Sequence, residues 1–208
     1  MRINQGKNHA VLRGVVADTP ALSHRVHNLS FYRIPLSVSR LSGKEDILNI
    51  LASETLLDTC PLTLGSQIEV TGEIRSFNNR SNIGSRLVIT LFAKSILHTS
   101  EAPCNEVMLN GVICKKPILR RTPLGRDICD LLLAVNRKYR RADYLPCIAW
   151  GTLALFCSHL EIGDCIAIDG RLQSRVYTKT IGETSIEHTA FELSIMSLDT
   201  IANQSPLP

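Results

Sequence analysis

Two runs of the C-terminal half have notable side chains separated by even numbers of residues: the rings of ADYLPCIAW, and the two arginines and one ring of GRLQSRVYT. Side chains two residues apart in a strand point to the same face. Tyr144 and Trp150 therefore share one face of the first run, and Arg171, Arg175 and Tyr177 share one face of the second. Flat rings stack on nucleobases and guanidinium groups contact phosphates, and a surface that holds an unpaired nucleic-acid strand needs both.

A short loop just before the first of these runs contains a fourth ring between cations. Its residues are Arg137, Lys138, Tyr139, Arg140 and Arg141. Arg121 adds a cation in an earlier loop. A single strand aromatic often packs into a core, and a charged loop is often only a solvated hairpin. The predicted binding face therefore depends on the rings and the cations lying on one surface.

An internal repeat indicates which elements position these residues. Gly14 in VLRGVV lies 97 residues before Gly111 in MLNGVI, and Gly72 lies 98 residues before Gly170. A repeat of about 100 residues predicts two copies of one domain. The two copies are joined by a short polar segment that contains Pro103. The predicted domains are residues 1–100, the more divergent copy, and residues 105–202.

Each copy shows the pattern of a strand, a loop, two more strands, a short helix and two final strands. In the second copy the predicted strands are Glu106–Cys114, Asp127–Asn136, Tyr144–Trp150, Cys165–Tyr177 and His188–Met196. Apolar residues with i, i+3, i+4, i+7 spacing predict a helix over 152–160. Pro61 should shorten the matching helix of the first copy. The sequence therefore predicts an all-β fold of two tandem five-stranded OB-type barrels, each with a short helix between strands 3 and 4.

The binding face is predicted to be weaker in the first copy. At the positions that match Tyr144 and Trp150, the first copy has Ile47 and Ser53, which stack on bases less well. Around a polar hairpin loop it keeps three arginines, Arg75, Arg80 and Arg86. These arginines could contact phosphates as a secondary binding site, or they could simply be solvated, and the sequence leaves both interpretations open.

Composition restricts the function classes. The 23 Lys and Arg against 19 Asp and Glu give a net charge of +4, which permits binding to a polyanion. The 7 cysteines include no CxxC pair and are expected to be reduced core thiols. The 6 histidines lack the spacing of a nucleophile–base pair or a metal site, so no catalysis, metal or cofactor is expected. No apolar run reaches the roughly 18 residues of a membrane span, so a cytoplasmic, nucleoid-associated location is expected.

The runs RTPLGRDICDLLLAVNRKYRRADYLPCIAW and GDCIAIDGRLQSRVYT resemble the bacterial single-stranded DNA-binding protein family. The resemblance is strong over about residues 105–200 and weaker over residues 8–97. It implies sequence-tolerant binding of single-stranded DNA in replication, recombination or repair, without catalysis. It also places the family's base-stacking rings at Tyr139, Tyr144, Trp150 and Tyr177.

The resemblance also implies partners. The family usually assembles four OB-folds, so a chain with two of them is expected to form a homodimer. Its members typically end in an acidic tail that recruits other proteins, whereas this sequence ends in NQSPLP, so recruitment by that route is not expected. The alternative interpretation is a primosome-type or accessory replication protein whose barrels mainly bind proteins. A replisome partner found together with weak strand affinity would favour that alternative.

Overall fold

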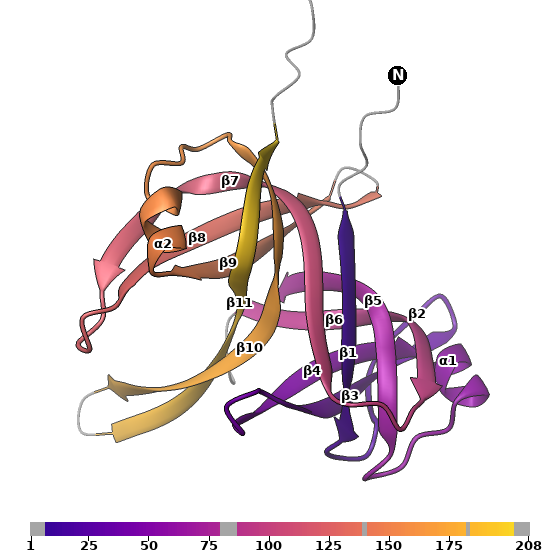
Figure 1. Ribbon diagram of the computed structural model, residues 1–208. Helices are drawn as coiled ribbons and strands as arrows, with labels where there is room; N and C mark the ends of the chain where they lie inside the picture. The colour runs from indigo at the N-terminus through magenta and orange to yellow at the C-terminus, as the bar shows by residue number, and fades with distance from the viewer. Residues whose placement is uncertain (1–6, 80–86, 139–140, 182–183, 202–208) are drawn as a thin grey trace, which may run out of the picture. The chain divides into compact units, whose positions relative to one another are not determined.

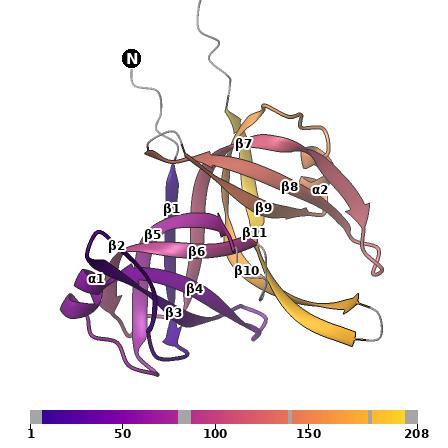
Figure 2. The same ribbon diagram turned by 180° about the vertical axis from the view of Figure 1, so that it is seen from behind.

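The computed structural model describes residues 7–79, 87–138, 141–181 and 184–201. Contacts divide these residues into two compact units, and each unit contains one barrel (Figures 1 and 2). The first unit comprises His9–Glu106 and Leu172–Phe191. The second comprises Val107–Arg171 with residues 7–8 and 192–201. A segment close to the C-terminus therefore belongs to the unit of the first barrel.

The first barrel is a closed sheet in which most neighbouring strands are antiparallel. Its elements are β1 (Asn8–Val16), β2 (Ala21–Val26), β3 (Leu29–Ser39), β4 (Glu45–Ser53), α1 (Glu54–Thr59), β5 (Gln67–Asn78) and β6 (Leu87–His98). Neighbouring strands follow the order β1-β5-β6-β4-β3, and the sheet closes because β1 also pairs with β3. β2 lies outside this ring of strands, antiparallel to β3, and all of its residues are exposed.

The second barrel repeats this arrangement. Its elements are β7 (Cys104–Arg121), β8 (Asp127–Asn136), β9 (Ala142–Trp150), α2 (Thr152–Cys157), β10 (Cys165–Ile181) and β11 (Thr184–Ile201). The strand order is β10-β11-β9-β8-β7, and pairing of β10 with β7 closes the sheet. A closed five-stranded barrel with a helix between the third and fourth strands is an OB-fold. The predicted all-β fold of two tandem OB-folds is confirmed.

Alternating apolar residues form the core of each barrel. In β4, Leu48, Ile50 and Ala52 are fully buried, whereas Ile47 and Ser53 lie on the opposite parity and are not. Branched residues suit a strand with one face against a core, and burial of each such side chain stabilises the fold by about 1.5–3 kcal/mol. The period of two thus fixes which side chains are available to a ligand.

β7 is longer than the sequence indicated. A loop was expected after Cys114, but the strand continues through Pro117 to Arg121. The pairing with β8 shifts register between Ile113 and Lys115 and again before Ile118, which marks β-bulges. A bulge tolerates proline because the residue that lacks an N–H donor need not pair there. The loop itself is confined to residues 122–126.

Both helices contain six residues, so the expected difference in their lengths is not found. α2 ends at Cys157 because the amides of His159 and Leu160 bond carbonyls three residues back, which tightens the chain into a turn. α1 ends at Thr59, before Pro61. The chain thus avoids placing a proline inside the helix.

The equivalent glycines Gly14 and Gly111 differ in the space around them, which gives a stability prediction. A Cβ at Gly14 would lie 2.1 Å from the carbonyl oxygen of Ser37, whereas at Gly111 the nearest atom, the oxygen of Ala134, is 3.2 Å away. We expect Gly14→Ala to lower the free energy of unfolding by about 1–3 kcal/mol and Gly111→Ala to have the smaller effect. Urea unfolding of the two variants measures this, and equal losses would contradict it.

Candidate nucleic-acid interface

The rings of β9 lie on the surface of the second barrel. Tyr144 is 52% exposed and Trp150 is 41% exposed, whereas the intervening Leu145, Cys147 and Ala149 are buried. The two rings lie at the two ends of the outward-facing row, as the parity argument predicts. The row is not open throughout, because Ile148, which shares their parity, is also buried. β9 thus offers two separate ring faces rather than a continuous aromatic strip.

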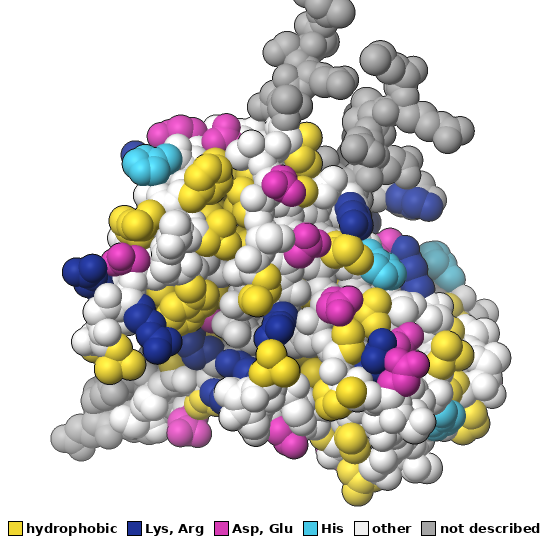
Figure 3. All heavy atoms as spheres, in the orientation of Figure 1, with side chains coloured by type: hydrophobic (Ala, Val, Ile, Leu, Met, Phe, Trp, Pro, Cys, Tyr) yellow, Lys and Arg dark blue, Asp and Glu magenta, His cyan; other side chains and the backbone are white. Residues whose placement is uncertain are grey.

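The arginines at the end of β7 are paired with aspartates on β8. Arg121 Nε donates to Asp127 Oδ1 at 3.1 Å, and Arg120 Nε donates to Asp130 Oδ2 at 2.5 Å. The hydrogen bond to Asp130 raises the pKa of Arg120, with burial opposing it. The Arg121 side chain remains 70% exposed, so it can still contact a phosphate. On the face of this barrel that Figure 3 shows, Lys and Arg side chains lie among apolar ones.

The cationic loop before β9 is only partly available to a ligand. Arg137 donates from Nε and Nη2 to the carboxylate of Asp143, which is fully buried. This arginine therefore stabilises a buried charge in addition to any contact with a ligand. Lys138 and Arg141 are exposed. Tyr139 and Arg140 lie outside the described residues.

On β10, the predicted alternation of rings and cations continues past the barrel core. Arg171 is half-buried, and Tyr177 is 38% exposed with its ring centroid 5.8 Å from the Arg175 Cζ. His188 on β11, which the sequence did not single out, stacks on Tyr177 at 5.6 Å between centroids. Val176 on the opposite parity is also exposed, because no core lies beneath this part of the strand. The structure thus brings Arg175, Tyr177 and a histidine together.

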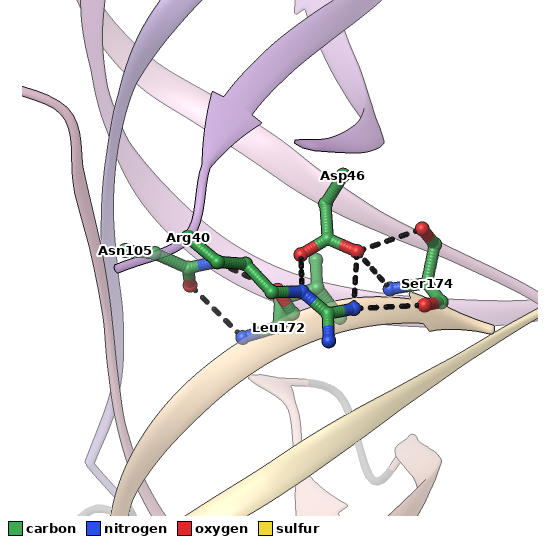
Figure 4. A network of polar contacts seen from close by, with 5 residues as sticks. All are labelled: Arg40, Asp46, Asn105, Leu172 and Ser174. Carbon is green, nitrogen blue, oxygen red and sulfur yellow. Dashed lines mark hydrogen bonds and ion pairs between the residues drawn. The ribbon is translucent and has the colours of Figure 1, made fainter. Parts of the chain in front are cut away.

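A polar network fixes the start of this segment within the first unit (Figure 4). The buried carboxylate of Asp46 accepts hydrogen bonds from Arg40 at 2.6 Å and from both the backbone N and the Oγ of Ser174 at 2.8 Å. Nearby, the Asn105 side-chain amide donates to the Leu172 carbonyl at 2.7 Å and accepts from its N–H at 2.9 Å. Burial acts to raise the pKa of Asp46, but the hydrogen bonds from Arg40 and Ser174 outweigh it, so that the pKa is lowered.

The secondary cationic group of the first barrel is only partly described. Arg75 lies on β5 with its Cζ 3.8 Å from the centroid of the Phe92 ring. Arg80 and Arg86 lie outside the described residues. Ile47 and Ser53 occupy the outward positions that match Tyr144 and Trp150. Near these positions lie rings on β2, β3 and β6 that the comparison of the two sequence copies did not identify.

Other chemistry finds little support in the described part of the chain. No group of three or more His, Cys, Asp or Glu there could hold a metal ion. All seven cysteines are free, and burial raises the pKa of both Cys147 and Cys157, that of Cys157 to about 12. Such thiols stay protonated at neutral pH and are poor nucleophiles. Neither described helix is long and apolar enough to cross a bilayer.

Two OB-folds with exposed rings beside arginines define a class of OB-fold proteins whose surface suits single-stranded nucleic acid. The model of the "Single-strand binding protein family" matches residues 104–197. "Single-stranded DNA-binding protein B" of Bacillus subtilis is 35% identical over 88 residues, which cover 38% of this chain and 75% of that protein. The chain therefore belongs to the single-strand binding protein family.

Two other proteins are similar to this chain, one in sequence and one in fold. A "Single-stranded DNA-binding protein" of Halalkalibacterium halodurans is 32% identical over 108 residues, and the match covers 49% of this chain and 64% of that protein. The chain thus spans less than two thirds of that relative's length. The "wild-type single-stranded DNA binding protein from Thermus aquaticus" is 22% identical with a TM-score of 0.78, and the match covers 98% of this chain and 97% of that one. This likeness shows the shared fold.

Proposed function

We propose that this protein binds and protects single-stranded DNA without reading its sequence, in replication, recombination or repair. The observation that carries this proposal is the pair of exposed rings on β9, Tyr144 and Trp150, on an OB-fold of this family. Every base has a flat face, so stacking on rings tolerates any sequence and contributes about 1–3 kcal/mol per base. Relatives named as single-stranded DNA-binding proteins support this proposal.

The cations supply the contacts to phosphates in this proposal. Of the cations predicted to bind, Arg121, Lys138 and Arg141 are exposed on the second barrel, and Arg171 and Arg175 follow along β10. Tyr177 with His188 offers a further ring pair, and Tyr139 and Arg140 complete the proposed set. Arg137 has a double role, because its guanidinium also pairs with Asp143. In the first barrel, Arg75, Arg80 and Arg86 form the proposed secondary cationic group.

We further propose that the protein is not an enzyme and acts in the cytoplasm, associated with the nucleoid. The two sequence copies, residues 1–100 and 105–202, are its proposed domains. Four OB-folds are the usual assembly of the family that the sequence resembles, so the proposed state is a homodimer. Sedimentation at equilibrium distinguishes a monomer of 23.0 kDa from a dimer of twice that mass.

Trp150 is the single tryptophan, so its fluorescence reports this site directly. We expect titration with oligo-dT to quench that fluorescence, because a base stacked on the indole changes its environment. The affinity should fall as salt rises, with a log–log slope of about −0.7 for each phosphate contacted, because bound phosphates release counterions. Unchanged fluorescence together with no salt-sensitive binding would reject the proposed function.

A further inference from the structure

Three rings and one guanidinium form a continuous cluster on the first barrel. The members of this first-barrel ring cluster are His24 on β2, Phe31 on β3, Phe92 on β6 and Arg75 on β5. The rings of His24 and Phe31 stack with centroids 5.1 Å apart and planes 9° apart. Phe31 and Phe92 lie 5.9 Å apart, and the Arg75 Cζ is 3.8 Å from the centroid of Phe92. Four strands thus contribute to one set of neighbouring planar groups, in which His24 and Phe31 are stacked and Phe92 is tilted by 35° to Phe31.

The cluster points away from the core of the barrel. On β6, Leu91 is fully buried, and its neighbour Phe92 has the opposite parity and is half-buried. On β3, Ile34 is fully buried, and Phe31 has the opposite parity. His24 is exposed, and the stack on Phe31 covers one face of its imidazole. A flat ligand can therefore extend the stack outward from His24.

The ladder between strands shows how this cluster relates to the rings of the second barrel. Trp150 on β9 pairs with Ile128 on β8. At the equivalent rung of the first barrel, Ser53 on β4 pairs with Phe31 on β3. At this rung, the first barrel therefore has its aromatic ring on β3, whereas the second barrel has its ring on β9, the strand that corresponds to β4. The first barrel keeps a ring at this place in the fold, although the residue that matches Trp150 is a serine.

Two buried polar atoms beside the cluster have no hydrogen-bond partner. Among the described residues, the buried side-chain nitrogen and oxygen atoms without a hydrogen-bond partner are the Arg75 Nε and the Thr90 Oγ1. Arg75 and Thr90 face each other on one rung of the β5–β6 ladder, next to Phe92. A buried polar atom without a partner is unfavourable. Both atoms are covered by the protein, so a ligand at the surface does not reach them directly.

The charge beside the rings is positive. Glu73 accepts a hydrogen bond from Arg75 at 3.1 Å and another from Lys94. Burial acts to raise the pKa of Glu73, but these two cations outweigh it, so that the pKa is lowered and the carboxylate is ionised at neutral pH. One carboxylate thus stands against two cations. The resulting excess of positive charge favours a ligand that carries phosphate.

We propose that the first-barrel ring cluster is a second base-stacking site for the same single-stranded DNA. A base stacks on the exposed face of His24, and Arg75 and Lys94 attract the neighbouring phosphate. This proposal rests on the proposed function, because it assigns a further part of the strand to the first barrel. It also adds rings to the proposed secondary cationic group there.

Photocrosslinking locates the stacked bases in the unaltered protein. An oligo-dT that carries 5-iodouracil, irradiated in the complex and followed by trypsin digestion, should give adducts on peptides 14–25 and 26–33, which contain His24 and Phe31. It should also give adducts on peptide 142–171, which contains Tyr144 and Trp150. Adducts confined to peptide 142–171 would overturn the second site and leave the proposed function intact. Binding and adducts absent altogether would overturn both.

Substitution at His24 measures the contribution of the site. We expect His24→Ala to weaken oligo-dT binding by about 5-fold to 10²-fold, the range for loss of one stacked base. His24→Phe should retain the affinity because it keeps a flat ring, which a role for the imidazole charge would not allow. His98→Ala, an exposed histidine on β6, is the matched control and should change little. Equal affinities for His24→Ala and His98→Ala would overturn the proposal.

Discussion

Replacement of Tyr144 and Trp150 together by alanine should weaken oligo-dT binding by about 10²-fold or more. Both rings are exposed on β9, and each stacked base contributes about 1–3 kcal/mol, where 1.4 kcal/mol is a factor of ten. Neither side chain fills the barrel core, so the loss should appear in binding and not in folding. Fluorescence anisotropy of a labelled oligo-dT measures the affinity without relying on the tryptophan that is removed.

Phe156→Ala provides the matched control for this double variant. Phe156 is also a ring on the second barrel, 49% exposed, but it lies on α2 and not on the strand that carries the proposed stacking rings. Its loss should leave the affinity nearly unchanged. If the double variant bound as tightly as Phe156→Ala, β9 would not be the main binding strand.

Asp46→Ala should lower the free energy of unfolding by about 3–5 kcal/mol, the range for breaking a buried charged pair. The carboxylate is 1% exposed and accepts hydrogen bonds from Arg40 and from two groups of Ser174. Alanine leaves these donors without their acceptor in a buried place. Chemical denaturation monitored by circular dichroism measures the loss.

Asp46→Asn separates the charge of this side chain from its shape. Because the folded-state pKa of Asp46 is lowered, its charge stabilises the fold above the ordinary pKa of 3.8. That contribution decreases as the pH falls through the folded-state pKa. The stability difference between the wild type and Asp46→Asn should therefore be full at neutral pH and shrink in acid. A difference that stays constant from neutral pH to about pH 2 would show that folding does not lower the pKa of Asp46.

The orientation of the β9 rings could be predicted from sequence because it is a local property. Once a strand has one face against a core, the period of two determines which face each side chain takes, as it does for Tyr144 and Trp150. The first-barrel ring cluster could not be found in this way. His24, Phe31 and Phe92 come from three strands, and only the register between strands brings them together.

The role of Arg137 shows a second limit of sequence reasoning. A run of cations predicts a charged loop, but it does not say which cation is already paired with an acid. The internal repeat did carry a signal: an aspartate lies six residues after both Arg40 and Arg137, and both aspartates are buried partners of these arginines. A charge pair repeated in both copies indicates a structural role more than a ligand contact.

The anchoring of Leu172 and Ser174 on the first barrel affects how this polypeptide can be divided. A fragment that stops at the linker would contain every strand of the N-terminal barrel and keep the Arg40 donor, yet it would lack the two Ser174 donors to Asp46. Because Ser174 belongs to the same chain as Asp46, these hydrogen bonds are intramolecular and their formation is independent of protein concentration.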